Sequence, residues 1–117
     1  MLVPSLTIDF QIPLQSATLE LAKKIAQLEP FGIGNAQPLF VSSGIIKDII
    51  YFGKQKQYTR YLLHDGDMGL LEITFFEKAS PLYTIGTAVA VAYYLKIDSW
   101  GGKIKLSAMG RYIGDKV

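Results

Sequence analysis

Two short segments of the chain combine aromatic rings with lysines, a pairing that suits contact with single-stranded nucleic acid. In the first, Tyr51-Phe-Gly-Lys-Gln-Lys-Gln-Tyr58, three aromatic residues bracket two lysines. The second, Lys96-Ile-Asp-Ser-Trp-Gly-Gly-Lys-Ile-Lys105, carries the only tryptophan of the chain. Aromatic rings stack on unpaired bases while lysines contact phosphates, and each stacked base contributes about 1–3 kcal/mol. These segments therefore indicate binding rather than catalysis.

Residue types for catalysis or metal binding are not grouped in the sequence. There is no cysteine and His64 is the only histidine, which excludes thiolate sites and a histidine metal triad. Asp65 and Asp67 lie in a glycine-containing segment typical of a turn and lack the further ligands of a calcium loop. Gly32 and Gly34 lack the third glycine of a dinucleotide fingerprint. We expect no catalytic residue, no metal and no cofactor in this chain.

The composition is that of a single globular domain. Of the 117 residues, 50% are hydrophobic and 19% are charged. The longest apolar run, residues 88–95, is much shorter than the roughly 20 residues that cross a bilayer. The first residues lack the basic start and apolar stretch of a signal peptide. We expect a soluble, cytoplasmic protein without membrane contact.

The first 37 residues predict a lead-in to the main domain. Leu6–Ile12 alternates apolar and polar residues, which predicts a short strand. Apolar residues recur at helical spacing over residues 21–28, which predicts an amphipathic helix with Ser16 as its N-cap. Residues 1–37 carry a net charge of −1, whereas residues 38–117 carry +3. We divide the chain into this strand-helix lead-in with its linker (1–37) and a main domain (38–117).

The main domain is expected to be mainly β. Turn residues separate five apolar segments, which predict strands at residues 39–52, 58–64, 70–76, 88–97 and 103–113. The connection between the third and fourth strands is longer than the others. This order is typical of an OB-fold, a five-stranded Greek-key barrel whose ligand face lies between the loops that follow the first and fourth strands. The two lysine-aromatic segments occupy those two loops.

Strand alternation sorts the side chains into an interior and an outer face. The expected interior residues are Leu71, Ile73, Phe75, Val89, Val91, Tyr93, Leu95, Ile97, Ile104, Leu106 and Ala108. The outer face and the two loops carry the candidate nucleic-acid contacts. We predict stacking by Tyr51, Tyr58, Tyr94 and Trp100, and phosphate contacts by Lys54, Lys56, Arg60, Lys96, Lys103, Lys105 and Arg111.

The same residues also have an ordinary structural interpretation. Aromatic residues at loop edges cap small cores, and lysines on hairpins keep proteins soluble. In addition, Ala88, Ala90 and Ala92 form a small, flat outer stripe suited to packing against another element. A docking or protein-interaction module with little DNA binding of its own stays open, as does a free-standing RNA-binding protein.

Residues 28–40, Leu-Glu-Pro-Phe-Gly-Ile-Gly-Asn-Ala-Gln-Pro-Leu-Phe, closely resemble a hallmark of the RecJ-type single-stranded-DNA-specific exonucleases. That family has Leu-x-Pro-Phe-Gly-x-Gly-Asn-x-x-Pro-x-Phe at the start of its OB-type domain. The matching residues are Leu28, Pro30, Phe31, Gly32, Gly34, Asn35, Pro38 and Phe40. The preceding strand and helix and the later segment Ile73–Phe76 also resemble the family, so the resemblance covers essentially the whole chain.

The resemblance implies that the chain is the C-terminal OB-type domain of a longer enzyme. Such enzymes degrade single-stranded DNA from its 5′ end in recombination and repair. Aspartate and histidine ligands hold two Mn or Mg ions in their catalytic core, which this chain lacks. Their OB-type domain holds the strand, so single-stranded DNA and the catalytic core of the same polypeptide are the expected partners. Asn35 would act as a turn former or offer its amide to a phosphate.

Overall fold

The computed structural model describes residues 10–27, 37–76 and 83–115. The elements in chain order are β1 (Phe10–Gln11), the 3-10 helix η1 (Leu14–Ser16), α1 (Leu19–Ala26), β2 (Phe40–Phe52), β3 (Tyr58–His64), β4 (Leu70–Phe75), β5 (Ala88–Trp100) and β6 (Lys103–Asp115). The mainly β class expected from the sequence is confirmed.

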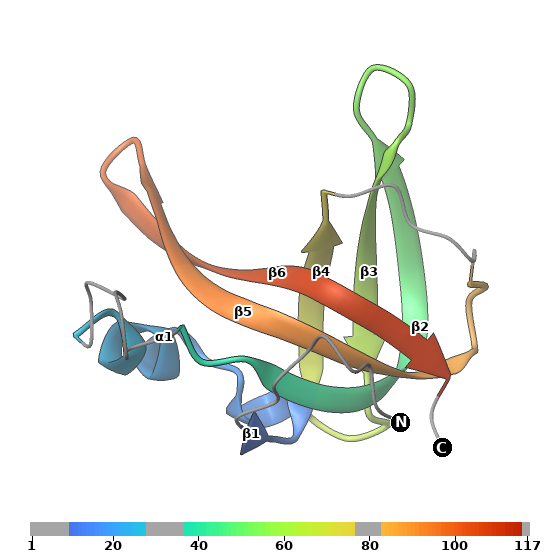
Figure 1. Ribbon diagram of the computed structural model, residues 1–117, viewed down its shortest axis with the longest axis horizontal. Helices are drawn as coiled ribbons and strands as arrows, with labels where there is room; N and C mark the ends of the chain where they lie inside the picture. Colours follow the sequence, from blue (N-terminus) through green and yellow to red (C-terminus); the bar gives the residue numbers. More distant parts are fainter. Residues whose placement is uncertain (1–9, 28–36, 77–82, 116–117) are drawn as a thin grey trace.

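Strands β2 to β6 close into a barrel. β2 pairs antiparallel with both β3 and β5, β3 pairs antiparallel with β4, and β5 pairs antiparallel with β6. A short parallel pairing between β4 and β6 closes the ring. This is the connectivity of the predicted five-stranded OB-fold barrel. The β2–β3 and β5–β6 hairpins extend beyond the barrel, at the top and upper left of Figure 1.

The β5–β6 hairpin is longer than its sequence predicts. The predicted fourth strand ends at residue 97, but strand pairing continues as far as Trp100 opposite Lys103. The turn consists of Gly101 and Gly102 alone, whose φ angles are 58° and 77°. A two-residue turn with both φ values positive matches the twist of the flanking strands, which lets pairing continue to the tip.

A bulge in β2 changes the direction of its side chains. The pairing with β3 shifts register between Ile46 and Asp48, so Lys47 is an extra residue without a direct partner. Ile46 is buried in the core before the bulge, and Ile49 packs against the core after it. One extra residue inverts the alternation, so Phe52 leaves the interior side of the strand.

The barrel interior is one hydrophobic core. The predicted interior residues Leu71, Ile73, Phe75, Val89, Val91, Tyr93, Leu95 and Ala108 are all buried. Ile97 and Leu106 are partly buried and pack against that core. The prediction is wrong for Ile104, which is 48% exposed because the long β5–β6 hairpin carries it beyond the barrel.

The described part of the lead-in packs on the barrel. β1 pairs in parallel with the start of β2, and η1 and α1 contribute buried residues to the same core. Thr18, rather than the expected Ser16, is the N-cap of α1, since its hydroxyl accepts a hydrogen bond of 3.1 Å from the Leu21 amide. Ser16 already belongs to η1. The rest of the expected strand and helix, residues 6–9 and 28, lies outside the described residues.

A buried hydrogen-bond network connects the lead-in to two strands of the barrel. Ser42 Oγ donates to the Ile12 carbonyl at 2.7 Å and lies 2.7 Å from the Tyr93 hydroxyl. Because a serine hydroxyl has one hydrogen, Tyr93 is the donor to Ser42. Burial raises the pKa of Tyr93 to about 12, although the hydrogen bond with Ser42 acts in the opposite direction. The Tyr93 hydroxyl is therefore protonated and able to donate at neutral pH.

We expect Ser42→Ala to lower the free energy of unfolding by about 1–3 kcal/mol, because it leaves the Ile12 carbonyl and the buried Tyr93 hydroxyl without a partner. Chemical denaturation measures the change. The control is Ser43→Ala, which alters the next, only partly buried residue of β2 and should change stability by less than about 0.5 kcal/mol. Equal losses in both variants would contradict a contribution from the network.

Candidate nucleic-acid interface

Three rings gather on the outer surface of the barrel below the β2–β3 hairpin. Phe52 ends β2, Tyr58 begins β3, and Phe76 follows β4. Their ring centroids lie 5.4 Å (Phe52–Tyr58), 5.5 Å (Tyr58–Phe76) and 6.0 Å (Phe52–Phe76) apart. We call these residues the aromatic cluster. Tilted and edge-on pairs at such distances stabilise one another. Phe76 is nonetheless 52% exposed, so the cluster offers ring surface to a ligand.

Arg60 is held against the aromatic cluster by three contacts. Its Cζ lies 4.9 Å from the Phe52 ring centroid, and its Nε donates to Thr74 Oγ1 at 3.3 Å. The same nitrogen lies 3.7 Å from Glu72 Oε1, but an ion pair between partly exposed side chains contributes little by itself. Together these contacts fix the guanidinium over the ring.

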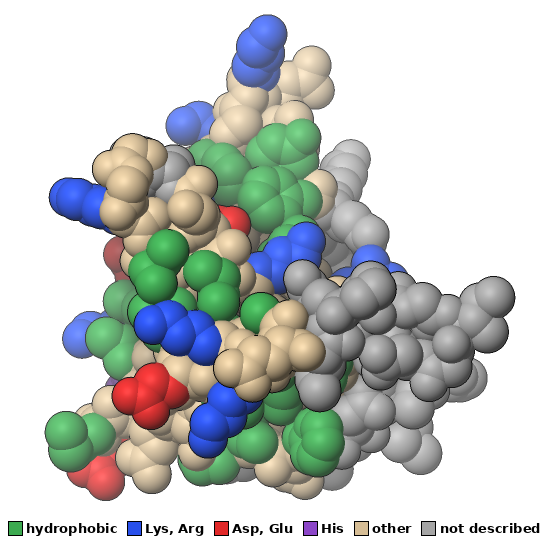
Figure 2. All heavy atoms as spheres, turned by 90° about the vertical axis from the view of Figure 1, so that its left-hand side faces the viewer, with side chains coloured by type: hydrophobic (Ala, Val, Ile, Leu, Met, Phe, Trp, Pro, Cys, Tyr) green, Lys and Arg blue, Asp and Glu red, His purple; other side chains and the backbone are tan. Residues whose placement is uncertain are grey.

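The outer face continues from β4 across β6 to β5. Thr74 of β4 lies opposite Met109 of β6, and Met109 lies opposite Tyr94 of β5. Further along the hairpin, Asp98 lies opposite Lys105. Figure 2 views the side from which this hairpin projects and shows lysine and arginine side chains distributed among hydrophobic ones, with few acidic groups between them.

A hollow of about 270 Å³ lies in this part of the face. It is lined by Gln37, Phe76, Tyr94, Lys96, Met109, Gly110 and Arg111, and we call it the sheet hollow. A second bulge helps to form it. Tyr93 pairs with Gly110 and Ala92 pairs with Tyr112, so Arg111 is the extra residue of β6. Gly110 and Arg111 of this bulge both line the sheet hollow.

The structure brings together five of the predicted contact residues. Arg60 lies against the aromatic cluster that includes Tyr58, while Tyr94, Lys96 and Arg111 line the sheet hollow. The predicted lysines of the two hairpins, Lys54, Lys56, Lys103 and Lys105, are all exposed. Trp100 is the last residue of β5. Tyr51 lies opposite Thr59, on the other side of the β2–β3 ribbon from Phe52 and Tyr58.

Sequence reasoning omitted four residues of this surface: Gln37, Phe52, Phe76 and Met109. Alternation along β4 and β6 places Phe76 and Met109 on the outer face, so both were open to selection from the sequence. Phe52 belongs to the first lysine-aromatic segment, but nothing in the sequence reveals the bulge at Lys47 that places its ring on this face. Gln37 lies in the connection before β2, where no periodic pattern fixes its direction.

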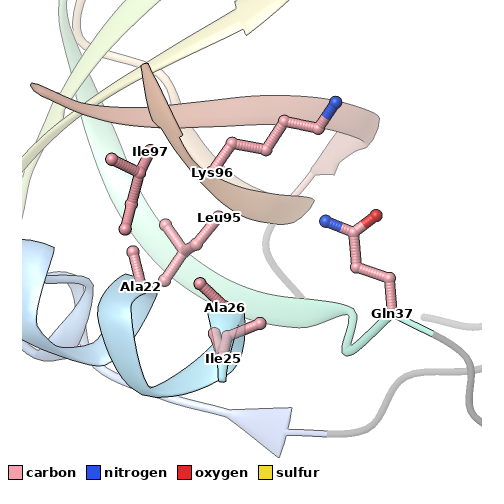
Figure 3. Close-up of a pocket in the computed structure, with 7 residues that line it drawn as sticks. All are labelled: Ala22, Ile25, Ala26, Gln37, Leu95, Lys96 and Ile97. Carbon is pink, nitrogen blue, oxygen red and sulfur yellow. The ribbon is translucent and has the colours of Figure 1, made fainter. Parts of the chain in front are cut away.

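A second hollow, of about 370 Å³, lies between α1 and β5 (Figure 3). Its lining residues are Ala22, Ile25, Ala26, Gln37, Leu95, Lys96 and Ile97. Five of these residues are apolar, and Lys96 points away from the helix. Gln37 and Lys96 border both hollows, so the two adjoin there.

The family-motif residues divide between described and undescribed parts of the chain. Pro30, Phe31, Gly32, Gly34 and Asn35 lie outside the described residues, whereas Pro38 and Phe40 are described. Phe40 is buried, and its ring centroid lies 5.6 Å from that of Phe10 and 6.2 Å from that of Tyr93. Its role is therefore in packing.

The described residues contain no group of three or more His, Cys, Asp and Glu side chains placed to hold a metal ion. No helix among the described segments has the length and hydropathy needed to cross a membrane.

The barrel connectivity and the placement of the two hairpins define an OB-fold protein. The family model described as the RecJ OB domain matches residues 8–111, and the chain belongs to that family. No curated protein sequence matches the chain.

Solved structures agree on the fold. RecJ from Thermus thermophilus in complex with Mn²⁺ superposes with a TM-score of 0.72 at 21% identity, over 94% of this chain and 16% of that one. The same protein in complex with Mg²⁺ gives 0.65 at 20% identity, over 84% and 15%. The mitochondrial single-stranded DNA binding protein Rim1 of S. cerevisiae gives 0.50 at 15% identity, over 65% and 89%. The chain thus spans about one sixth of the RecJ chains that it matches.

The turn of the β2–β3 hairpin places Lys56 in an unfavourable backbone conformation. Its φ angle is 56°, and its amide donates to the Gly53 carbonyl at 3.1 Å. The left-handed region costs a residue with a Cβ roughly 1–2 kcal/mol, a cost that glycine avoids.

We expect Lys56→Gly to raise the free energy of unfolding by up to about 1 kcal/mol, since relief of the φ strain outweighs the added chain entropy of glycine. Lys54→Gly is the matched control, because it removes the same charge from the same loop at a position without positive φ. It should not stabilise the fold. Thermal and urea unfolding of the two variants give the comparison, and equal effects would exclude backbone strain at Lys56.

Proposed function

We propose that this chain is the single-stranded-DNA-binding domain of a RecJ-like 5′-to-3′ exonuclease that acts in cytoplasmic DNA recombination and repair. The strand lies across the outer face of β3, β4, β6 and β5, between the two lysine-bearing hairpins. Hydrolysis and its Mn or Mg ions belong to a catalytic core outside this chain. Membership of the RecJ OB domain family supports this assignment.

One observation carries the proposal: exposed aromatic surface lies beside fixed positive charge on the ligand face of an OB-fold. Three rings and the Arg60 guanidinium meet there, with ring centroids no more than 6.0 Å apart. A folded protein gains little by exposing rings to water, whereas bases of a single strand stack on them. Glu72 and Asp98 partly offset the lysines of this face, so binding depends on stacking as well as on phosphate contacts.

Exposed apolar residues at the other end of the outer face, away from the aromatic cluster, support a docking role. Ile45, His64 and Leu70 lie in one row across β2, β3 and β4, and Ile45 and Leu70 are 36% and 52% exposed. The neighbouring Met68 is 84% exposed. This apolar patch would bind the catalytic core or another protein. The alanine stripe supports docking less, because Ala92 is only 2% exposed.

The charge contribution is tested by fluorescence anisotropy with labelled oligo-dT at low salt. We expect Lys54→Ala/Lys56→Ala/Lys103→Ala/Lys105→Ala to weaken binding tenfold or more, equivalent to about 1.4 kcal/mol. With about four or five phosphates neutralised, log K should fall against log salt with a slope near −3 for the unmodified chain, and less steeply for the variant.

Charge-matched controls separate a local effect from a general one. Lys54→Ala/Lys56→Ala and Lys23→Ala/Lys24→Ala each remove two positive charges, but the second pair lies on α1. Only Lys54→Ala/Lys56→Ala should weaken binding of oligo-dT appreciably. Equal binding by all variants would place the strand on another surface, and no binding by the folded, unmodified chain would favour the docking role.

The stacking contribution is tested with two tyrosines on opposite sides of the β2–β3 ribbon. Tyr58→Ala should weaken oligo-dT binding about tenfold, within the range for one stacked base, whereas Tyr51→Ala should leave it within about twofold. Circular dichroism checks that both variants fold. A larger loss with Tyr51→Ala would mean that the strand follows the other side of the ribbon.

A further inference from the structure

We propose that the sheet hollow is a pocket for one unpaired nucleobase, turned out of the strand that crosses the face. This inference rests on the proposed function but goes beyond it, because a strand can be held by its phosphates and by the aromatic cluster alone. It predicts a second position in the bound strand, next to the base stacked on the aromatic cluster, at which a base is required.

The walls of the sheet hollow suit a flat ring system. Phe76 and Tyr94 line it, and both are aromatic residues of the outer face. Met109 also lines it, and its flexible thioether adapts to rings of different size. Phe76 belongs to the aromatic cluster as well, so a base in the sheet hollow lies next to one stacked on the cluster.

The polar groups of the sheet hollow suit the edge of a base and its phosphates. The Gln37 amide offers both a hydrogen-bond donor and an acceptor, and so do the polar edges of the bases. An amide of this kind favours the presence of a base over its absence and discriminates weakly among bases. Lys96 and Arg111 line the same hollow and bring positive charge to the strand backbone.

Size and position favour a base over other occupants. The hollow of about 270 Å³ lies near the lower end of the roughly 300–1,000 Å³ of small-molecule pockets, which is room for one base rather than a longer group. It also lies between the two lysine-bearing hairpins. An apolar protein side chain would make no use of Lys96 and Arg111.

The test is an abasic scan of the shortest oligo-dT that binds the chain with full affinity, so that its ends fix the register. A single abasic nucleotide is moved along the oligonucleotide, and binding is measured by fluorescence anisotropy. We expect about a tenfold loss at two neighbouring positions, one for the base stacked on the aromatic cluster and one for the base in the sheet hollow, and less than about threefold at the others. A strong loss at one position only, coupled to Tyr58→Ala and not to Tyr94→Ala, would overturn the base pocket while leaving the proposed function intact.

Variants of the chain show which of these positions belongs to the sheet hollow. Tyr94→Ala should weaken binding of the intact oligonucleotide about tenfold but change binding of the abasic one by less than about twofold. Gln37→Ala should show the same coupling with a smaller loss, and it provides the test should Tyr94→Ala not fold. Gln27→Ala, which alters an exposed glutamine at the end of α1 outside both hollows, is the matched control for Gln37→Ala and should affect neither oligonucleotide.

The outcomes distinguish the inference from the function on which it rests. Independent, multiplicative losses from Tyr94→Ala and the abasic nucleotide would place the required base elsewhere and overturn the pocket. Failure of the folded chain to bind the intact oligonucleotide would instead overturn the proposed function, and the pocket with it.

Discussion

The outer face of this barrel depends on one extra residue in β2. Phe40 and Ile46 face the core, so an unbroken alternation would direct Phe52 inward as well. The bulge at Lys47 reverses that direction, and Phe52 joins Tyr58 and Phe76 outside. A single inserted residue thus converts what would be core surface into ligand surface. The same strand can then pair with β5 along its first half and with β3 along its second.

The buried core of the barrel leaves the aromatic rings of the outer face free to be exposed. Val89, Val91 and Ile73 are fully buried in the barrel interior, and Ser42 hydrogen-bonds both to Tyr93 and to Ile12 of the lead-in. Stability therefore does not require the outer rings to be covered. Those rings instead contact one another and Arg60, which limits their motion before any ligand arrives. A platform that is ordered in advance loses less conformational entropy on binding.

Simple alternation predicted the fold and most of the interior because it holds without interruption along β3, β4 and β5. It fails after the bulge in β2: unbroken alternation from Phe40 would place Tyr51 outside, whereas the structure places Phe52 on the face with Tyr58. In β6, alternation places Arg111 on the outer face with Met109, and both residues line the sheet hollow, although the bulge beside them was not predicted. Bulges depend on pairing between distant strands, which a local sequence pattern does not contain.

If the chain binds DNA as proposed, the balance of charge and rings on the outer face favours single strands over duplexes. Charge alone would favour a duplex, which carries one negative charge per roughly 1.7 Å of its axis. The bases of a duplex are stacked on one another and present no free ring surface to Phe76 or Tyr94. An unpaired strand does present it. Glu72 and Asp98 reduce the positive potential of the face. The electrostatic attraction for DNA, which duplexes and single strands share, is therefore weakened. The stacking that only a single strand can make then decides between them.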